Sequence, residues 1–205
     1  TEGEPDGADG PVVRDAEVVY HVAAQPGISS DVPFDLFVRN NLIATHRLME
    51  AVKGARSLRG FVYVSTSSVY GAYATEPETA APAPTSYYGV TKLAAEQLAL
   101  SYFRDYGLPV CSMRLYSVVG PRERPEKLFT RLIRSIVEER EFPLCEGSRE
   151  HTRSYTYVRD AVEGFVNALD RLDACRGEIF NVGSDVEVKT GDGIDILERI
   201  LGRRA

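Results

Sequence analysis

Residues 60–71, GFVYVSTSSVYG, and residues 85–96, TSYYGVTKLAAE, carry the pattern that decides the fold. Gly60–Val64 is a short apolar run rich in β-branched and aromatic residues, which is typical of a strand buried in a parallel sheet. Four consecutive hydroxyl side chains follow it directly. Beyond a proline-rich loop, Tyr88 and Lys92 stand four residues apart at the start of a predicted helix, so they share one helix face. The sequence therefore predicts a phenol, an ammonium and hydroxyls near one strand end, a set suited to removing the proton of an alcohol.

The Tyr88–Lys92 pair would be weak evidence by itself. Tyrosine is common in the chain, with 11 residues, and Lys92 could pair with Glu96 on a solvent-exposed helix face. Runs of hydroxyl side chains are also common in turns. An apolar strand, a hydroxyl run, a loop and a well-formed helix in this order are far less common, so the combination favours an active site.

The composition is that of an ordinary globular protein. With 205 residues and 43% hydrophobic composition, the chain can bury a substantial core. A formal net charge of −6 argues against a broad surface for nucleic acid or for an anionic membrane. No segment has the roughly 18–20 apolar residues that a membrane-spanning helix needs, so we expect neither partner.

The three cysteines, Cys111, Cys145 and Cys175, are isolated in the sequence. None stands in a Cys-x-x-Cys pair or at metal-ligand spacing from a histidine, so we predict no metal site. Scattered cysteines of this kind are typical of reduced thiols, which indicates a cytoplasmic protein.

The start of the sequence indicates a piece of a longer protein. Residues 1–16 are acidic and rich in Gly and Pro, which predicts a loop, and residues 18–24, VVYHVAA, predict a buried parallel strand. A parallel strand of this kind needs neighbours on both sides, so we expect earlier strand–helix units to be missing. No GxxGxxG-type glycine loop follows any predicted strand. Further strands are predicted at 109–119 and 178–183, and helices at 34–52, 86–106, 126–139, 158–172 and 191–201.

Taken together, the strand, the hydroxyl run and the Tyr-x-x-x-Lys pair resemble the active site of the extended short-chain dehydrogenase/reductase family, whose members are nucleotide-sugar epimerases and dehydratases. The resemblance covers nearly the whole chain from Val18 onward. It implies an α/β fold, a partial Rossmann-like doubly wound parallel sheet with a smaller C-terminal substrate-binding region. Residues 1–120 would form the partial NAD-binding domain, without the family's glycine-rich loop for the cofactor pyrophosphate and so without half of the cofactor site. Residues 121–205 would form mainly the substrate-binding region, with the strand at 178–183 near the junction.

The resemblance also implies roles for individual residues. Thr66, Tyr88 and Lys92 match the family's catalytic triad: the lysine charge favours the tyrosine phenolate, which takes a proton from a sugar alcohol as hydride leaves for NAD. Threonine would orient the reacting oxygen. A UDP-sugar substrate is implied, and so is a homodimer, because the family commonly pairs through helices such as the one bearing Tyr88. The implied cofactor contacts are Ala23, Ala24, Gln25, Asn41, Ser65, Tyr88, Lys92 and Tyr116, and the implied substrate contacts are Thr66, Ser67, Ser68, Ser117, Arg124 and Arg153.

The residues after Thr66 bear on the choice within the family. Dehydratases carry Asp-Glu there and UDP-glucuronate decarboxylases carry a Glu, whereas this chain has Ser67 and Ser68, which are poor general acids. The Thr-Ser-Ser run, Ser117 and Arg124 resemble the UDP-glucuronate 4-epimerase subgroup, in which these groups hold the substrate carboxylate. A UDP-glucose or UDP-N-acetylglucosamine 4-epimerase, a decarboxylase or dehydratase, and an inactive nucleotide-binding fragment stay open as alternatives. We expect the 205-residue chain by itself to be inactive.

Overall fold

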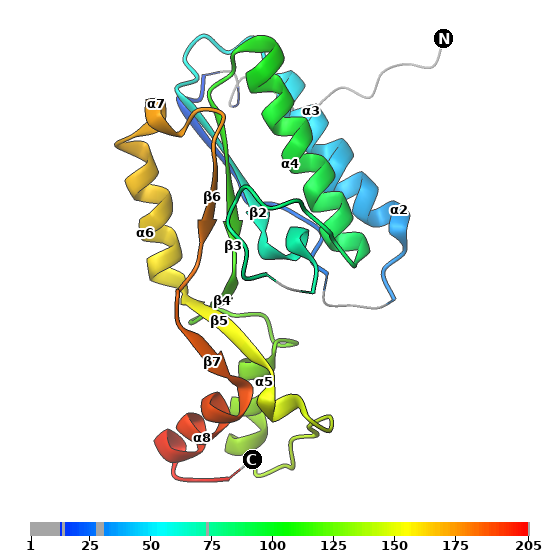
Figure 1. Ribbon diagram of the computed structural model, residues 1–205, viewed down its shortest axis with the longest axis vertical. Coiled ribbons are helices and arrows are strands. Elements are labelled where there is room, and N and C mark those ends of the chain that lie inside the picture. Colours follow the sequence, from blue (N-terminus) through cyan, green and yellow to red (C-terminus); the bar gives the residue numbers. More distant parts are fainter. Residues whose placement is uncertain (1–12, 14, 28–30, 73, 205) are drawn as a thin grey trace. The chain divides into compact units, whose positions relative to one another are not determined.

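The computed structural model describes residues 13, 15–27, 31–72 and 74–204, in two compact units (Figure 1). The first unit runs to Leu115 and also contains Phe165–Asn181, and the second contains Tyr116–Gly164 and the residues from Val182 onward. This division differs from the predicted boundary after residue 120, because a C-terminal segment returns to the first unit. Most of the predicted loop at 1–16 lies outside the described residues.

The first unit is built on a four-stranded sheet with the order β1–β2–β3–β6. β1, β2 and β3 run parallel, with Val18 opposite Gly60 and Phe61 opposite Val110. Every residue of β2 is buried, as expected for a central strand covered on both faces. The predicted parallel α/β fold is therefore confirmed. The strands are β1 (Val18–His21), β2 (Gly60–Thr66), β3 (Val110–Leu115) and β6 (Ile179–Val182).

Helices lie side by side along one face of this sheet (Figure 1). The predicted helix at 34–52 is three consecutive helical segments, α2 (Phe34–Phe37), the π-helix η1 (Val38–Ile43) and α3 (Ala44–Val52). Their neighbour is α4 (Tyr87–Tyr106). The core between these helices and the sheet is made mainly of Met49, Val52, Phe61, Tyr63, Ala95, Ala99, Leu100 and Val110.

The ends of α4 follow from its sequence. Ser86 is the N-cap, and its hydroxyl accepts a hydrogen bond from the Gly89 amide at 3.1 Å. Gly107 ends the helix in the left-handed conformation, with φ of 70°, which costs glycine little because it has no Cβ. Both ends agree with the helix predicted at 86–106.

The buried and exposed faces of α4 are unusual. Two of its charged residues, Lys92 and Glu96, are buried, at 2% and 0% exposure, whereas Tyr87 and Val90 are 61% and 43% exposed. Glu96 accepts two hydrogen bonds from Arg114 of β3, from Nη2 at 2.6 Å and from Nε at 3.0 Å. The alternative of a solvated Lys92–Glu96 pair is therefore wrong, since that helix face points into the protein.

The other face of the sheet packs against a short helical segment of the first unit. The predicted helix at 158–172 is two helices, α6 (Val158–Leu169) and α7 (Leu172–Cys175). The Tyr20 hydroxyl donates to the Phe165 carbonyl at 2.9 Å. Leu172 lies so close to Gly60 that a Cβ at Gly60 would stand 2.6 Å from the leucine side chain. These contacts explain why the C-terminal segment belongs to the first unit.

The second unit has a three-stranded sheet with the order β4–β5–β7. β4 and β5 are parallel, and β5 and β7 are antiparallel. The strand predicted at 109–119 is therefore wrong as one element: it is β3 in the first unit and β4 in the second, with Tyr116 between them. The elements are β4 (Ser117–Val119), α5 (Leu128–Val137), the short 3₁₀ helix η3 (Ser148–Glu150), β5 (Thr152–Tyr157), β7 (Glu187–Lys189) and α8 (Thr190–Leu201).

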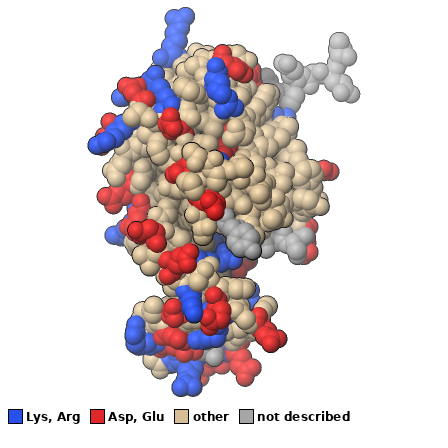
Figure 2. Space-filling model, in the orientation of Figure 1, with Lys and Arg blue, Asp and Glu red and all other residues tan. Residues whose placement is uncertain are grey.

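Acidic and basic side chains lie interspersed on the face shown in Figure 2. The three cysteines are free thiols. Among the described residues, no helix is both long and apolar enough to cross a membrane. In the same part of the chain, His, Cys, Asp and Glu side chains nowhere gather in a group of three that could hold a metal ion.

Candidate active site

The hydroxyl run lies at the carboxyl end of β2, where ligands bind in open parallel sheets. Thr66 is the last residue of β2 and caps the 3₁₀ helix η2 (Ser67–Tyr70). Its Oγ1 accepts a hydrogen bond from the Ser68 amide and donates one to the Ser68 hydroxyl, both at 3.2 Å. The preceding Ser65 hydroxyl is buried and has no hydrogen-bond partner among the residues that the structure describes. The turn thus fixes the Thr66 hydroxyl but not the Ser65 hydroxyl.

The Lys92 ammonium is held against the same strand end. Its Nζ donates to the Val64 carbonyl at 2.6 Å and stands 4.2 Å from the centre of the Tyr63 ring. Burial lowers the pKa of Lys92 to about 8, an effect that the negative charge of Glu96 partly offsets. An ammonium has three N–H donors, so its bond to Val64 leaves donors for a bound molecule.

Tyr88 lies one helical turn before Lys92 and is half-buried. A Cβ on Gly27 would come within 2.6 Å of the Tyr88 Cβ, so this tyrosine packs directly on the loop after β1. Tyr88 also affects the ionisation of Tyr63, a buried residue of β2. Its pKa is raised mainly by burial, and further by Tyr88 and Glu96. Tyr88 therefore acts electrostatically on Tyr63, the same residue whose ring lies against the Lys92 ammonium.

A glycine brings α4 close to the hydroxyl run. A Cβ on Gly89 would stand 2.7 Å from the Ser68 carbonyl oxygen and 3.0 Å from the Pro84 Cβ. Real Cβ atoms do not approach a backbone oxygen so closely, so a side chain at this position would push the helix away from the turn. Gly89 thus sets the spacing between the Thr66 turn and the turn that carries Tyr88.

Asn41 ties the loop after β1 to the start of α4. Its Oδ1 accepts from the Gln25 amide at 2.6 Å, and its Nδ2 donates to the Gln25 carbonyl at 3.3 Å and to Thr91 Oγ1 at 3.1 Å. Thr91 in turn donates to the carbonyls of Tyr87 and Tyr88. One buried amide in the π-helical turn therefore fixes two segments that flank the candidate site.

A buried imidazole supports Asn41 from behind. The Thr45 hydroxyl donates to the Asn41 carbonyl at 2.6 Å, so its oxygen is free to accept from His21 Nε2 at 2.8 Å. Burial, and then the charge of Lys92, lower the pKa of His21 to about 4. The imidazole is therefore neutral at pH 7 and serves as a donor, not as a charge.

The predicted site residues are divided between the two units. Ala23 and Ala24 are exposed directly after β1, on the chain that leads to Gln25. Ser67 and Ser68 form the start of η2. Four predicted residues belong to the second unit: half-buried Tyr116 between the strands, Ser117 as the first residue of β4, exposed Arg124, and exposed Arg153 on β5.

Sequence reasoning missed four supporting groups. The Val64 carbonyl and the Tyr63 ring gave no signal, because any buried strand offers such groups. Gly89 did give one: a glycine inside a predicted helix lowers helix stability by about 1 kcal/mol relative to alanine and so asks for a packing reason. Thr91 was not singled out either, although threonine commonly bonds back to the preceding helical turn.

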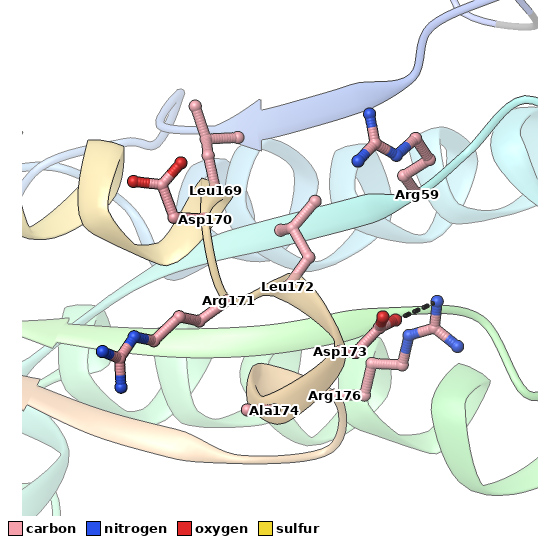
Figure 3. Close-up of a pocket in the computed structure, with 8 residues that line it drawn as sticks. All are labelled: Arg59, Leu169, Asp170, Arg171, Leu172, Asp173, Ala174 and Arg176. Carbon is pink, nitrogen blue, oxygen red and sulfur yellow. Dashed lines mark ion pairs between the residues drawn. The ribbon is translucent and has the colours of Figure 1, made fainter.

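A hollow of about 550 Å³ opens at the opposite, amino end of the strands, beside Arg59, which precedes β2 (Figure 3). Its guanidinium groups do not converge: Arg59, Arg171 and Arg176 point in different directions, and Arg176 pairs with Asp173 at 2.8 Å. The remaining lining residues are Leu169, Asp170, Leu172 and Ala174. The hollow is therefore not part of the candidate site.

A parallel α/β unit with hydroxyls at a strand end and a Tyr-x-x-x-Lys helix beside them is a short-chain dehydrogenase/reductase unit of the extended type. The chain belongs to the NAD dependent epimerase/dehydratase family, whose model matches residues 11–183. It is 34% identical over 197 residues to the uncharacterized UDP-glucose epimerase YtcB of Bacillus subtilis, covering 95% of this chain and 61% of that protein.

Two further relatives carry different activities in their names. The trifunctional UDP-glucose 4,6-dehydratase/epimerase/reductase RHM3 of Arabidopsis thaliana is 32% identical over 197 residues, which is 93% of this chain and 29% of that protein. The UDP-glucuronic acid 4-epimerase of Bacillus cereus, in complex with UDP-glucuronic acid and NAD, superposes with a TM-score of 0.90 at 36% identity. The match covers 98% of this chain and 64% of that one, so the chain spans less than two thirds of each relative.

Gly89→Ala tests the close approach of α4 to the hydroxyl run. In an ordinary helix this change stabilises by up to about 1 kcal/mol, but here the methyl group must displace the Ser68 carbonyl, so we expect a loss of about 1–3 kcal/mol in the free energy of unfolding. The matched control is Gly164→Ala in α6, where a Cβ would stand 3.5 Å from Val182 and should be tolerated. Urea unfolding measures both, and an equal gain in the two variants would contradict the close approach.

The pH dependence of unfolding tests the neutral state of His21. Its folded pKa is about 4 against an ordinary value near 6.5, so the unfolded chain binds more protons between these two pH values. Stability should therefore fall as pH drops from 6.5 to 4, with roughly 3 kcal/mol due to this one group. Urea unfolding of His21→Gln should lack that part of the loss. An imidazole resonance of His21 that titrates near pH 6.5 in NMR spectra would contradict the assignment.

Proposed function

We propose that the protein containing this chain is an NAD-dependent nucleotide-sugar 4-epimerase, with UDP-glucuronate as its substrate. The observation that carries the proposal is the buried ammonium of Lys92, bonded to the Val64 carbonyl one helical turn after Tyr88. A buried charge is costly, so a site that keeps one beside a half-exposed phenol is a candidate for proton transfer. Membership of the epimerase/dehydratase family supports the reaction class.

Several features of the first unit fit a bound NAD. The Ser65 hydroxyl, at the carboxyl end of β2, is buried and finds no hydrogen-bond partner in the described part of the chain, and Ala23 and Ala24 are small and exposed after β1. Gln25 is held by Asn41 beside them. We propose these residues, with Tyr88, Lys92 and Tyr116, as cofactor contacts. When bound, NAD would accept hydride from the sugar carbon and return it.

The residues of the chain would supply the proton transfer. Tyr88 is proposed as the general base for the sugar C4 hydroxyl, because a phenol becomes a usable base when a cation favours its phenolate. Lys92 is proposed to supply that positive charge. Thr66, whose hydroxyl is oriented by the Ser68 amide, is proposed to hold the reacting oxygen. Once the keto sugar has rotated in the site, its opposite face would receive the hydride at C4, which inverts that carbon, and Tyr88 would return the proton to the C4 oxygen.

The choice of sugar rests on residues beyond the triad. Ser67 and Ser68 follow Thr66 where a dehydratase or decarboxylase would need carboxyl side chains, which favours epimerisation. Ser117, Arg124 and Arg153 lie in the second unit. We propose that Ser117 and Arg124 hold the sugar carboxylate, since a charge-assisted contact would keep a β-keto acid from aligning for loss of CO₂. Arg153 is proposed as the contact for the nucleotide diphosphate.

The second unit would then be mainly the substrate-binding region and the first the partial NAD-binding domain. The main alternative is a 4-epimerase for a neutral sugar such as UDP-glucose, which the name of the Bacillus subtilis relative favours. In that enzyme Arg124 would have no carboxylate to bind.

We also propose a homodimer that pairs through α4 and its neighbours. Tyr87 and Val90 are exposed on α4, and the Tyr87 ring packs on the exposed Phe34 at 5.0 Å between centroids. Exposed aromatic and aliphatic side chains that lie together are typical of an interface. Light scattering of the full-length protein should give twice the chain mass, with Val90→Glu shifting it to monomer, and a monomeric wild-type protein would contradict the proposal.

The test of function uses the full-length protein with UDP-glucuronate and NAD. Conversion to the C4 epimer is expected, and Tyr88→Phe should lower kcat by about 10³-fold or more, because the base is removed while the ring stays. The matched control is Tyr87→Phe, which removes an exposed hydroxyl from the neighbouring position. Full activity of Tyr88→Phe, or unchanged UDP-glucuronate with the wild-type protein, would contradict the proposal.

The same assay with UDP-glucose decides the sugar. We expect slower turnover than with UDP-glucuronate, and Arg124→Ala should impair only the glucuronate reaction, with release of CO₂. Faster turnover of UDP-glucose, with no effect of Arg124→Ala on either reaction, would establish the neutral-sugar alternative.

A further inference from the structure

Tyr70 is a buried phenol at the end of the turn that Thr66 caps. It is 5% exposed and is the last residue of η2. Its hydroxyl donates to Asn181 Oδ1 at 2.8 Å and accepts from Arg114 Nη1 at 2.7 Å. The guanidinium of Arg114 also stands 4.8 Å from the centre of the Tyr70 ring. Both the ring and the hydroxyl of this tyrosine are therefore fixed.

The group that holds Tyr70 is itself held by α4. Arg114 is 1% exposed and forms a two-bond ion pair with Glu96, which is fully buried. The Ser112 hydroxyl donates to the same carboxylate at 3.0 Å. Glu96 lies one helical turn after Lys92 on the buried face of α4. Planar, bidentate contacts of this kind fix orientation as well as distance. Through Arg114 and Glu96, the position of Tyr70 is therefore fixed relative to α4, the helix that carries Tyr88.

The loop that runs from η2 to α4 is bonded to Asn181, the residue that also accepts the hydrogen bond of Tyr70. The Asn181 amide donates to Glu78 Oε1 at 2.7 Å, and its side-chain nitrogen donates to the Glu76 carbonyl at 3.3 Å. The loop that runs from η2 to α4 is thereby anchored where Tyr70 is anchored. A displacement of the Tyr70 hydroxyl would therefore disturb both η2 and the loop that leads to α4.

We propose that Tyr70 is a positioning residue for Thr66, an inference that rests on the proposed function. η2 is a single short turn, with Thr66 as its N-cap and Tyr70 as its last residue. Because the Ser68 amide and hydroxyl connect the Thr66 hydroxyl to this turn, fixing Tyr70 fixes the direction of the Thr66 hydroxyl. Small misplacements of a reacting group lower the rate of catalysis far more than the binding of substrate.

The first test is Tyr70→Phe in the full-length protein, with UDP-glucuronate and NAD. The ring and its contact with Arg114 stay, and only the hydroxyl is lost. We expect kcat to fall by about tenfold, with KM and the affinity for NAD within about twofold of wild type. The control is Tyr106→Phe, which removes the hydroxyl of an exposed tyrosine at the far end of α4 and should change nothing.

A double-mutant cycle separates positioning from a loss of stability. If Tyr70 acts through Thr66, then adding Tyr70→Phe to Thr66→Ala should lower kcat no further. Unchanged kcat in Tyr70→Phe, or a double variant whose loss is the product of the two single losses, would overturn the inference.

Hydrogen exchange of the full-length protein tests the same claim without substrate. In Tyr70→Phe the amides of Ser68 and Gly71 should exchange about tenfold faster, while the amide of Leu100 in the middle of α4 keeps its rate. Unchanged rates at Ser68 and Gly71, or equal acceleration at all three amides, would overturn the positioning role. A wild-type protein inactive on UDP-sugars would instead refute the proposed function, and hydrogen exchange would still decide the role of Tyr70.

Discussion

The hydrogen bond from the Lys92 ammonium to the Val64 carbonyl is the contact on which the candidate site depends. It joins the second turn of α4 to the carboxyl end of β2 at 2.6 Å. An ammonium taken out of water is costly, and the lowered pKa of Lys92 records that cost. What the protein gains is a fixed cation near Tyr88, on a strand whose next residues are the hydroxyls of Ser65 and Thr66. Rigid elements on both sides give such a site its definition.

Two further devices keep α4 in this position. The absence of a side chain at Gly89 lets the helix approach the Ser68 carbonyl, and the Glu96–Arg114 ion pair fixes the helix against β3. Replacing one partner of such a buried pair leaves an uncompensated charge. Lys92 and Glu96 of α4 are thus buried while Tyr87 and Val90 are exposed, an arrangement that the proposed homodimer would explain.

The sequence predicted the central part of this arrangement well, because its signals are local. The apolar run of β2, the Ser86 cap and the Gly107 end of α4 lie within or beside the elements that they define. Features that depend on contacts distant in sequence were not predicted. The apolar run at 109–119 gives no sign that its first part pairs with β2 and its last part with β5. β5 itself was not predicted, because it is a polar strand with few buried residues. Arg114 inside an apolar strand was the one signal of the buried ion pair, because a charge in such a run needs a partner.

A crystal structure of the full-length protein with NAD and UDP-glucuronate tests the central claim most directly. The account predicts that the Tyr88 phenol and the Thr66 hydroxyl both lie within hydrogen-bonding distance of the sugar C4 oxygen, with the Lys92 ammonium still bonded to the Val64 carbonyl. A C4 oxygen out of reach of the phenol, or an ammonium that has left Val64 to pair with Glu96, would contradict it.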